Sequence, residues 1–95
     1  MAIKIKPDYA EAHYNLGNAL SAERKIDEAI SHYKMAIKIK PDYADAHNNL
    51  GSALFQKGEM KEAIDHYKEA IRIRPGFAAA QKNLETVLRR SGELE

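Results

Sequence analysis

Four histidines are the residues of this chain with the most versatile chemistry, and their spacing groups them into two pairs. His13 and His47 are 34 residues apart, and so are His32 and His66. A metal site needs ligands that converge within about 2.0–2.1 Å of one ion, whereas no histidine here lies one helical turn from another on one expected helix. We therefore predict that His13 and His47 pack between helices and that the chain binds no metal.

Other residues that could perform catalysis do not form a recognisable site. The chain has no glycine-rich phosphate loop and no local grouping of serine, histidine and aspartate, and its carboxylates are paired only where helices are expected to begin. It has no cysteine, which excludes a disulfide scaffold and a zinc site made of thiolates. We expect the protein not to be an enzyme and to need no cofactor.

Asparagines recur with the same spacing as the histidines, at Asn15, Asn49 and Asn83. The asparagine amide carries both a donor and an acceptor, so it can pair with the backbone of an extended peptide without reading the peptide side chains. It can equally bond to the preceding loop or to a neighbouring helix. Both interpretations stay open at the level of the sequence.

The same spacing organises the whole chain, because Pro7, Pro41 and Pro75 follow it too. Residues 7–40 and 41–74 align without a gap and match at 20 of 34 positions, and residues 1–6 are identical to residues 35–40. A fixed period of this length indicates a repeat array. The expected units are the tail of a preceding repeat at 1–6, full repeats at 7–40 and 41–74, and a terminal capping helix at 75–95.

Each unit contains two helical patterns and no strand-like alternation. In the second unit, apolar residues recur at helical spacing on both sides of Gly58, and Pro75 ends the second run. We predict an all-α fold. The expected helices span 8–23, 26–39, 42–57, 60–73 and 76–91.

Most charged residues are expected at the ends of these helices. Cations complement the negative end of the helix dipole, and anions complement the positive end. The basic pairs at the ends of the second helices are Lys4/Lys6, Lys38/Lys40 and Arg72/Arg74. The acidic residues at helix starts are Asp27, Glu28, Glu59 and Glu62, with Asp8/Glu11 and Asp42/Asp45 as capping pairs.

The overall charge balance narrows the class of partner. Lysine and arginine number 15 and aspartate and glutamate 14, for a net charge of +1, which argues against nucleic acid or a membrane surface as the partner. No apolar run is long enough to cross a bilayer, so no membrane span is expected. No signal peptide precedes the first lysines, and we expect a cytoplasmic protein.

The unit resembles the tetratricopeptide repeat, a pair of antiparallel helices with this period. The residues that carry the resemblance are His13, Leu16, Gly17, Leu20, Ala29, Tyr33 and Pro41, and then His47, Leu50, Gly51, Leu54, Ala63, Tyr67 and Pro75. The resemblance implies a right-handed α-α superhelix in which Gly17 and Gly51 let paired helices approach closely. Gln81 and Glu85 depart from the pattern, which suits a polar terminal cap.

The resemblance also implies a protein–protein interaction module that binds a peptide or partner protein in a concave groove lined by the first helix of each unit. The implied groove residues are Tyr14, Asn15, Asn18, Asn48, Asn49, Ser52, Phe55, Lys82, Asn83 and Arg89. Lys82, Arg89 and Arg90 make the part of the groove on the last helix basic, while Glu11 and Asp45 make the parts on the other two helices slightly acidic. We therefore expect a ligand that is acidic near residues 76–91.

Two branches of the family are relevant to the ligand. The Asn-Leu-Gly motif is similar to the arrays of O-linked N-acetylglucosamine transferase-like proteins. A clamp that holds C-terminal carboxylates in another branch is largely lost, because Tyr14, Ala79 and Asn83 replace its basic residues.

Alternative functions are a self-assembling or engineered repeat fragment without a dedicated ligand, and a targeting domain excised from a larger transferase-like enzyme. Uncapped ends predict weak head-to-tail self-association. Arg24 stands where Gly58 and Gly92 end the other first helices, so residues 21–30 could run as one continuous helix and produce a domain-swapped dimer. A closed turn and a swapped one both remain open.

Overall fold

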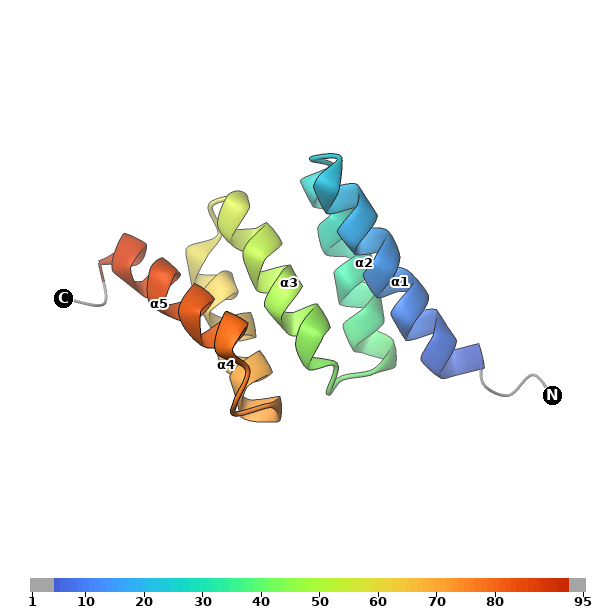
Figure 1. Ribbon diagram of the computed structural model, residues 1–95. Coiled ribbons are helices and arrows are strands. Elements are labelled where there is room, and N and C mark those ends of the chain that lie inside the picture. Colours follow the sequence, from blue (N-terminus) through green and yellow to red (C-terminus); the bar gives the residue numbers. More distant parts are fainter. Residues whose placement is uncertain (1–4, 93–95) are drawn as a thin grey trace.

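The structure is a computed structural model that describes residues 5–92, with side chains described from Tyr9 onward. Over this range the chain forms five α-helices and no strand, which confirms the all-α prediction (Figure 1). The helices are α1 (Ile5–Ala22), α2 (Ile26–Ile39), α3 (Ala44–Gln56), α4 (Met60–Ile73) and α5 (Ala78–Ser91). The bounds of α2 and α4 are those predicted, and the other ends differ by at most three residues.

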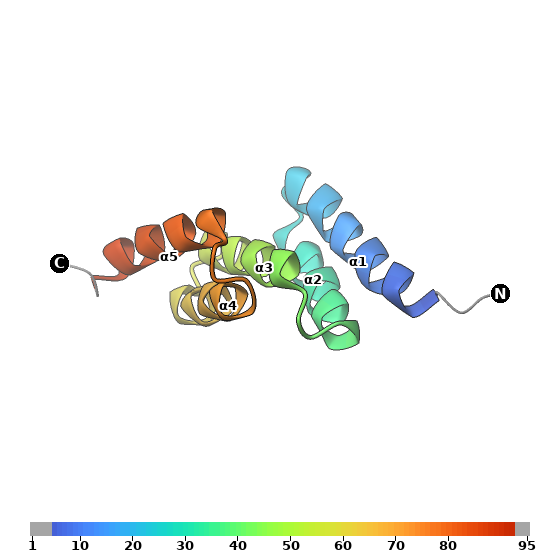
Figure 2. The same cartoon turned by 60° about the horizontal axis from the view of Figure 1, so that its bottom comes forward.

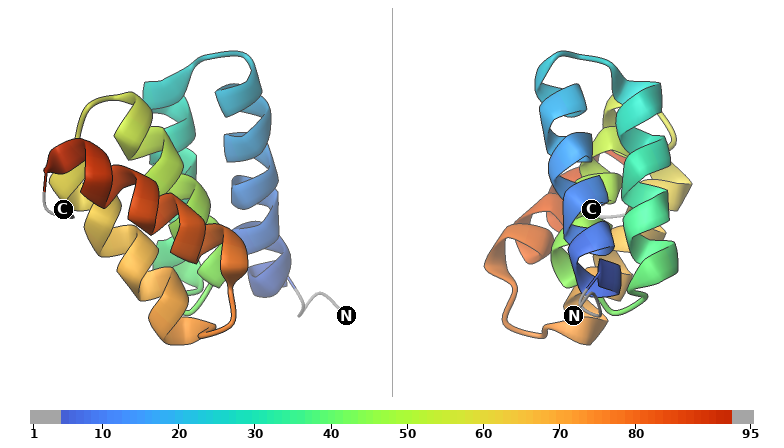
Figure 3. Two further views of the ribbon diagram at one scale, coloured as in Figure 1. Left: turned by 60° about the vertical axis from the view of Figure 1, so that its left-hand side comes forward. Right: turned by 90° about the vertical axis from the view of Figure 1, so that its right-hand side faces the viewer.

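The helices are arranged in two layers along an elongated molecule of 53 × 29 × 17 Å. The first helices of the units, α1, α3 and α5, form one layer, and α2 and α4 form the other (Figure 2). Each helix packs mainly against its neighbours in the sequence, so α1 and α5 lie at opposite ends (Figures 1 and 3). We call α1, α3 and α5 the first-helix layer.

Small residues set the distance between the two layers. A Cβ added to Gly17 would lie 2.7 Å from Cε1 of Tyr33, and one added to Gly51 would lie 2.8 Å from Cε1 of Tyr67. Real Cβ atoms essentially never come so close, so only glycine permits this approach. The close contact expected at Gly17 and Gly51 is confirmed, and the core is otherwise rich in buried alanine.

The turn between α1 and α2 is closed, so both helices of the first pair come from the same chain. The backbone N–H of Arg24 donates to Ser21 (2.9 Å) and that of Lys25 donates to Leu20 (2.8 Å). This is the Schellman arrangement, in which the residue after the helix adopts a left-handed conformation. Arg24 does so with φ of 63°.

The start of α1 differs from the prediction. The helix begins at Ile5, so Pro7 lies in its first turn, where a missing N–H costs nothing because that group has no partner within the helix. Lys6 therefore lies at the beginning of a helix, and its predicted place at a helix end is wrong. Lys4 lies outside the described residues. The other basic residues, Lys38, Lys40, Arg72 and Arg74, are at helix ends as predicted.

The predicted capping pairs are also wrong. Asp8 lies inside α1, so it does not cap it. α3 begins at Ala44 with Tyr43 as its N-cap, and no side chain caps it. The backbone explains the shift: the N–H of Tyr43 donates to the carbonyl of Lys40 (3.1 Å) in a turn that carries the chain past Asp42 before the helix begins.

None of the helices that the structure describes is long and apolar enough to cross a membrane.

Candidate functional site

A chain of side-chain hydrogen bonds links the three helices of the first-helix layer. Its members are Asn18 on α1, Asn48 and Asn49 on α3, Asn83 on α5, and the hydroxyls of Tyr14 and Tyr33. We call this set the asparagine network. It includes five of the ten residues predicted to line a groove, namely Tyr14, Asn18, Asn48, Asn49 and Asn83.

Asn49 is the centre of the network. Its Nδ2 donates to Oδ1 of Asn18 at 2.8 Å and to the hydroxyl of Tyr14 at 3.2 Å, both on α1. The hydroxyl of Tyr33, from α2, donates to the same Oδ1 of Asn18 at 2.6 Å. Burial raises the pKa of Tyr33 above its usual value, so this phenol remains a donor at neutral pH. Asn49 thus connects the first helices of both full units.

Asn48 continues the network towards the last helix. Its Nδ2 donates to Oδ1 of Asn49 at 3.3 Å, and its own Oδ1 accepts from Nδ2 of Asn83 at 3.1 Å. Asn48 is buried, and Asn49 and Asn83 are half-buried. For Asn49 and Asn83 the structure therefore shows the second interpretation of the repeated asparagine, a bond to a neighbouring helix. Asn15 is exposed and has no such bond within residues 5–92.

The network leaves hydrogen-bonding groups open. Each side-chain amide has two N–H groups and an oxygen with two lone pairs, and Nδ2 of Asn18 and Oδ1 of Asn83 make no bond within the described residues. No buried side-chain nitrogen or oxygen lacks a partner there, so these open groups are in contact with solvent. The opposite end of the same amide is held by a hydrogen bond in both residues.

The other predicted groove residues lie outside the network. The hydroxyl of Ser52 is 2.9 Å from that of Tyr67 on α4. Phe55 is half-buried, and the guanidinium of Arg90 lies 5.7 Å from the centre of its ring. Lys82 and Arg89 are exposed, and Arg89 pairs with Glu85 at 3.1 Å. Since these residues lie on α3 and α5, an apolar ring and several cations occur at this end of the molecule.

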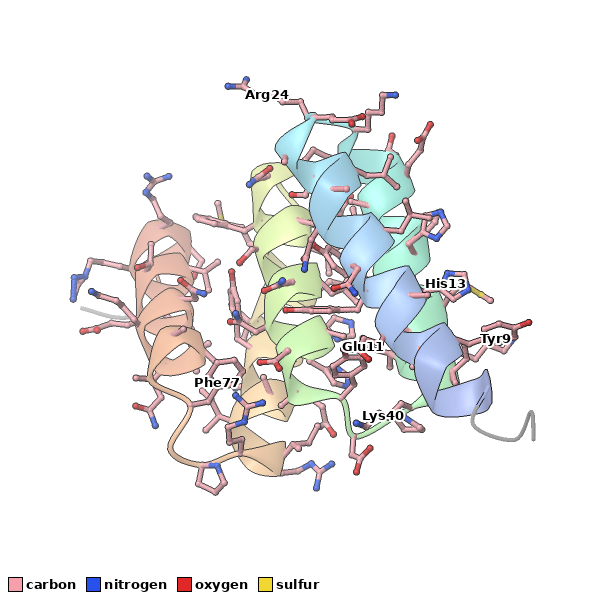
Figure 4. The ribbon with its side chains drawn as sticks, turned by 45° about the vertical axis from the view of Figure 1, so that its right-hand side comes forward. Tyr9, Glu11, His13, Arg24, Lys40 and Phe77 are labelled. Carbon is pink, nitrogen blue, oxygen red and sulfur yellow. The ribbon has the colours of Figure 1, made fainter. Side chains whose placement is uncertain are left out.

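The opposite end is aromatic and less acidic than expected. Tyr14 lies against Tyr43, with ring centres 5.0 Å apart. Burial, and after it the charge of Glu11, raises the pKa of Tyr43. Asp45, one of the two carboxylates expected to make this end acidic, is paired with Arg74 at 3.2 Å. Glu11, on α1 (Figure 4), makes no ion pair among the side chains that the structure describes.

The histidines form two stacked pairs between the layers. The Nδ1 atoms of His47 and His66 are 3.1 Å apart, and those of His13 and His32 are 3.0 Å apart. The rings are stacked with centres 5.3 and 5.2 Å apart. The predicted packing of His13 and His47 is confirmed. Among the described residues, no three side chains of histidine, cysteine, aspartate or glutamate cluster closely enough to hold a metal ion.

The proton positions in the second pair follow from its neighbours. Nε2 of His47 lies 3.0 Å from the carbonyl oxygen of Pro41, which can only accept, so Nε2 carries the proton. Nδ1 of neutral His47 must then accept from Nδ1 of His66. Burial, and then the nearby His47, lowers the pKa of His66, against the opposing charges of Glu62 and Asp65.

Sequence reasoning missed three tyrosines of this region. Tyr33 and Tyr67 were named only as positions of the repeat motif, whereas their hydroxyls bond to Asn18 and Ser52. The sequence signal for these bonds was the hydroxyl group itself, since both positions carry a tyrosine where a phenylalanine would fill the same buried space. Tyr43 was missed as well, although aromatic residues stand at the equivalent places one repeat before and after it, Tyr9 and Phe77.

Comparisons with known proteins agree with this repeat architecture. A family model described as "Tetratricopeptide repeat" matches residues 14–78, and another described as "TPR repeat" matches residues 1–23. Two crystal structures, described as MamA and MamA protein, are similar to this chain, with TM-scores of 0.87 and 0.86 and 33% identity in both cases. A comparison with curated proteins found no match.

Each MamA structure matches 92% of this chain. The chain spans only 51% of the first MamA chain and 48% of the second, which is about half of their length. The close likeness to a solenoid of helix pairs confirms the predicted superhelical fold class. A closer relation to the transferase-like arrays stays a prediction. The family match covers most of the chain. The chain belongs to the tetratricopeptide repeat family.

Proposed function

We propose that the first-helix layer binds an extended peptide segment of a partner protein without catalysis, and that the segment is acidic where it meets α5. Tetratricopeptide repeats generally mediate protein–protein interaction. The observation that carries the proposal is the asparagine network, which runs across α1, α3 and α5 and leaves amide groups open to solvent.

The chemistry of the open groups suits a peptide backbone. An extended peptide presents N–H and carbonyl groups at regular intervals, and Nδ2 of Asn18 and Oδ1 of Asn83 supply a donor and an acceptor for them. Because their amides are already bonded on the other side, little further ordering is needed when a ligand binds. Asn15, which is exposed, and Asn49, which is half-buried, would extend the same polar surface.

The charged groups of α5 give the peptide a direction. Lys82, Arg89 and Arg90 lie on α5, while the acidic Glu11 lies on α1. Electrostatic complementarity of this kind sets orientation and association rate more than affinity. Phe55, beside Arg90, offers an apolar contact next to the cations. An acidic peptide residue next to an apolar one suits this end.

The proposal predicts that reversing one charge weakens binding. The probe is a blocked decapeptide of alternating glutamate and alanine, followed by fluorescence anisotropy at low salt. Lys82→Glu should weaken binding several-fold, because an attraction becomes a repulsion. Lys61→Glu, on α4 in the other layer and also exposed, is the matched control and should change binding little. Equal effects of the two substitutions would contradict the proposal.

No particular observation favours the remaining alternatives. Head-to-tail self-association, an origin as an engineered fragment and a role as the targeting domain of a transferase-like enzyme stay predictions. The same holds for a cytoplasmic location.

A further inference from the structure

The turn between α1 and α2 holds its central residue in an unfavourable backbone conformation. Arg24 is the one non-glycine residue with positive φ in the part of the chain that the structure describes, at 63°. The left-handed region brings Cβ close to the following carbonyl oxygen, so residues other than glycine rarely occupy it. The Arg24 side chain points away from the protein (Figure 4), and no hydrogen bond or ion pair within residues 5–92 holds it there.

The turn between α3 and α4 provides a matched comparison. Its hydrogen bonds are the same: Gly58 N–H donates to Phe55 (3.0 Å) and Glu59 N–H donates to Leu54 (2.8 Å). Gly58 has φ of 88°, and a Cβ added to it would meet nothing within 4 Å. The two turns therefore differ in backbone strain and not in packing.

The strained turn has an unstrained alternative. No glycine or proline occurs between Asn18 and Lys40, and residues 21–26 (SAERKI) all tolerate a helix. A continuous helix from α1 into α2 would place Arg24 in ordinary helical geometry. The same opening at Gly58 would release no strain and would place a poor helix former inside a helix.

A single chain cannot open this turn without losing most of the packing of α1. In the closed form α1 contributes the close contact of Gly17 with Tyr33, the bond from Tyr33 to Asn18 and the stacking of His13 on His32. These contacts are recovered if α1 of one chain packs on α2 of a second copy. The turn is short, with three residues between the helices, and short strained hinges favour such exchange.

We propose that this protein forms a dimer in which two copies exchange α1, with the helix running unbroken through Arg24 in each chain. The partner is a second copy because only it offers an α2 surface of matching shape. The closed monomer and the exchanged dimer bury the same surfaces between α1 and α2, so the conformation of the hinge sets the balance between them. The proposal is independent of peptide binding.

The first experiment moves the arginine from one turn to the other. The chain is unfolded in urea, refolded at about 1 mM, and its mass is measured by size exclusion with light scattering. Two hinges open in each dimer, so Arg24→Gly should weaken dimerisation by about 30-fold or more. Gly58→Arg in the Arg24→Gly background should restore dimers, because it creates the same strain at the second turn. Failure of either change would overturn the proposal, as would a wild-type chain that is wholly monomeric at this concentration.

A second experiment tests which helix is exchanged. His13→Cys and His32→Cys are placed in separate chains, which are refolded together and treated with a short bismaleimide. Exchange brings position 13 of one chain beside position 32 of the other, so covalent heterodimers should form. Arg24→Gly in both chains should remove them. Crosslinking that persists with Arg24→Gly would indicate side-by-side association and would contradict the exchange.

Discussion

Each asparagine of the network has more hydrogen-bonding groups than the protein itself uses. In Asn18 and Asn83 one end of the amide is bonded to a neighbouring helix and the other end is open to solvent, whereas both amide ends are bonded in Asn48 and Asn49. The two interpretations of the repeated asparagine are therefore compatible. At the scale of single residues, the contribution of an asparagine to stability can be separated from its contribution to binding. Asn15 makes this possible because it occupies the repeated position but makes no bond to a neighbouring helix in the part of the chain that the structure describes.

Asn49→Ala should lower the free energy of unfolding by about 1 kcal/mol, since it removes the donor shared by Asn18 and Tyr14. Asn15→Ala is the control at the equivalent exposed position and should stay within about 0.5 kcal/mol of the wild type. Urea denaturation followed by circular dichroism measures both. Equal losses would show that the hydrogen bonds of Asn49 do not stabilise the fold.

The pair of His47 and His66 should make stability depend on pH. The pKa of His66 is lowered in the folded state, mainly by burial, so the unfolded chain binds more protons as the pH falls through the ordinary histidine range near 6.5. The free energy of unfolding should therefore be highest above that range and should decrease as the pH falls below it. Lys34 adds to this shift, while Glu62 and Asp65 oppose it.

His66→Gln should flatten this dependence, because glutamine does not titrate and can still donate towards His47. The free energy of unfolding is measured in urea at several pH values between 5 and 8. The wild type should lose more stability than the variant on going from pH 7.5 to pH 5. An equal loss in both proteins would rule out His66 as the cause.

At the scale of the helices, the distance between paired helices is set by glycine facing tyrosine. Gly51→Ala should cost about 1–3 kcal/mol, because the added Cβ would meet the ring of Tyr67, which is buried and bonded to Ser52. Gly76→Ala is the matched control, since a Cβ there meets nothing within 4 Å. It should be neutral or slightly stabilising. Thermal unfolding of the two variants measures the difference, and the melting temperature of Gly51→Ala should be the lower one. Similar melting temperatures would contradict the explanation by close packing.

The helices also show which parts of the fold are predictable from the sequence. The bounds of α2 and α4 were predicted because apolar periodicity and the residues that end it agree there. The start of α1 and the caps were not, because Pro7 is tolerated in a first turn and a backbone turn replaces side-chain capping at α3. The asparagine network could be predicted as a row on one face. Its bonds to Tyr14 and Tyr33 could not, because they depend on the crossing of separate helices.

At the scale of the whole molecule, equivalent positions differ according to what covers them. Leu50 is fully buried, while Leu16, its equivalent in the preceding repeat, is 45% exposed at the open side of α1. Leu50→Ala should cost about 2–5 kcal/mol, whereas Leu16→Ala should cost far less. Chemical denaturation measures the difference. Equal costs would mean that Leu16 is covered in solution, as it would be in a side-by-side assembly.

The whole molecule is proposed to present one layer of helices to its ligand, and that is the claim to test most directly. The measurement is a nuclear magnetic resonance titration of the ¹⁵N-labelled chain with the glutamate–alanine peptide. Shifts should be confined to backbone amides of α1, α3 and α5 and to the side-chain amides of Asn18 and Asn83. Shifts centred on α2 and α4, or none at millimolar peptide, would contradict the proposed function.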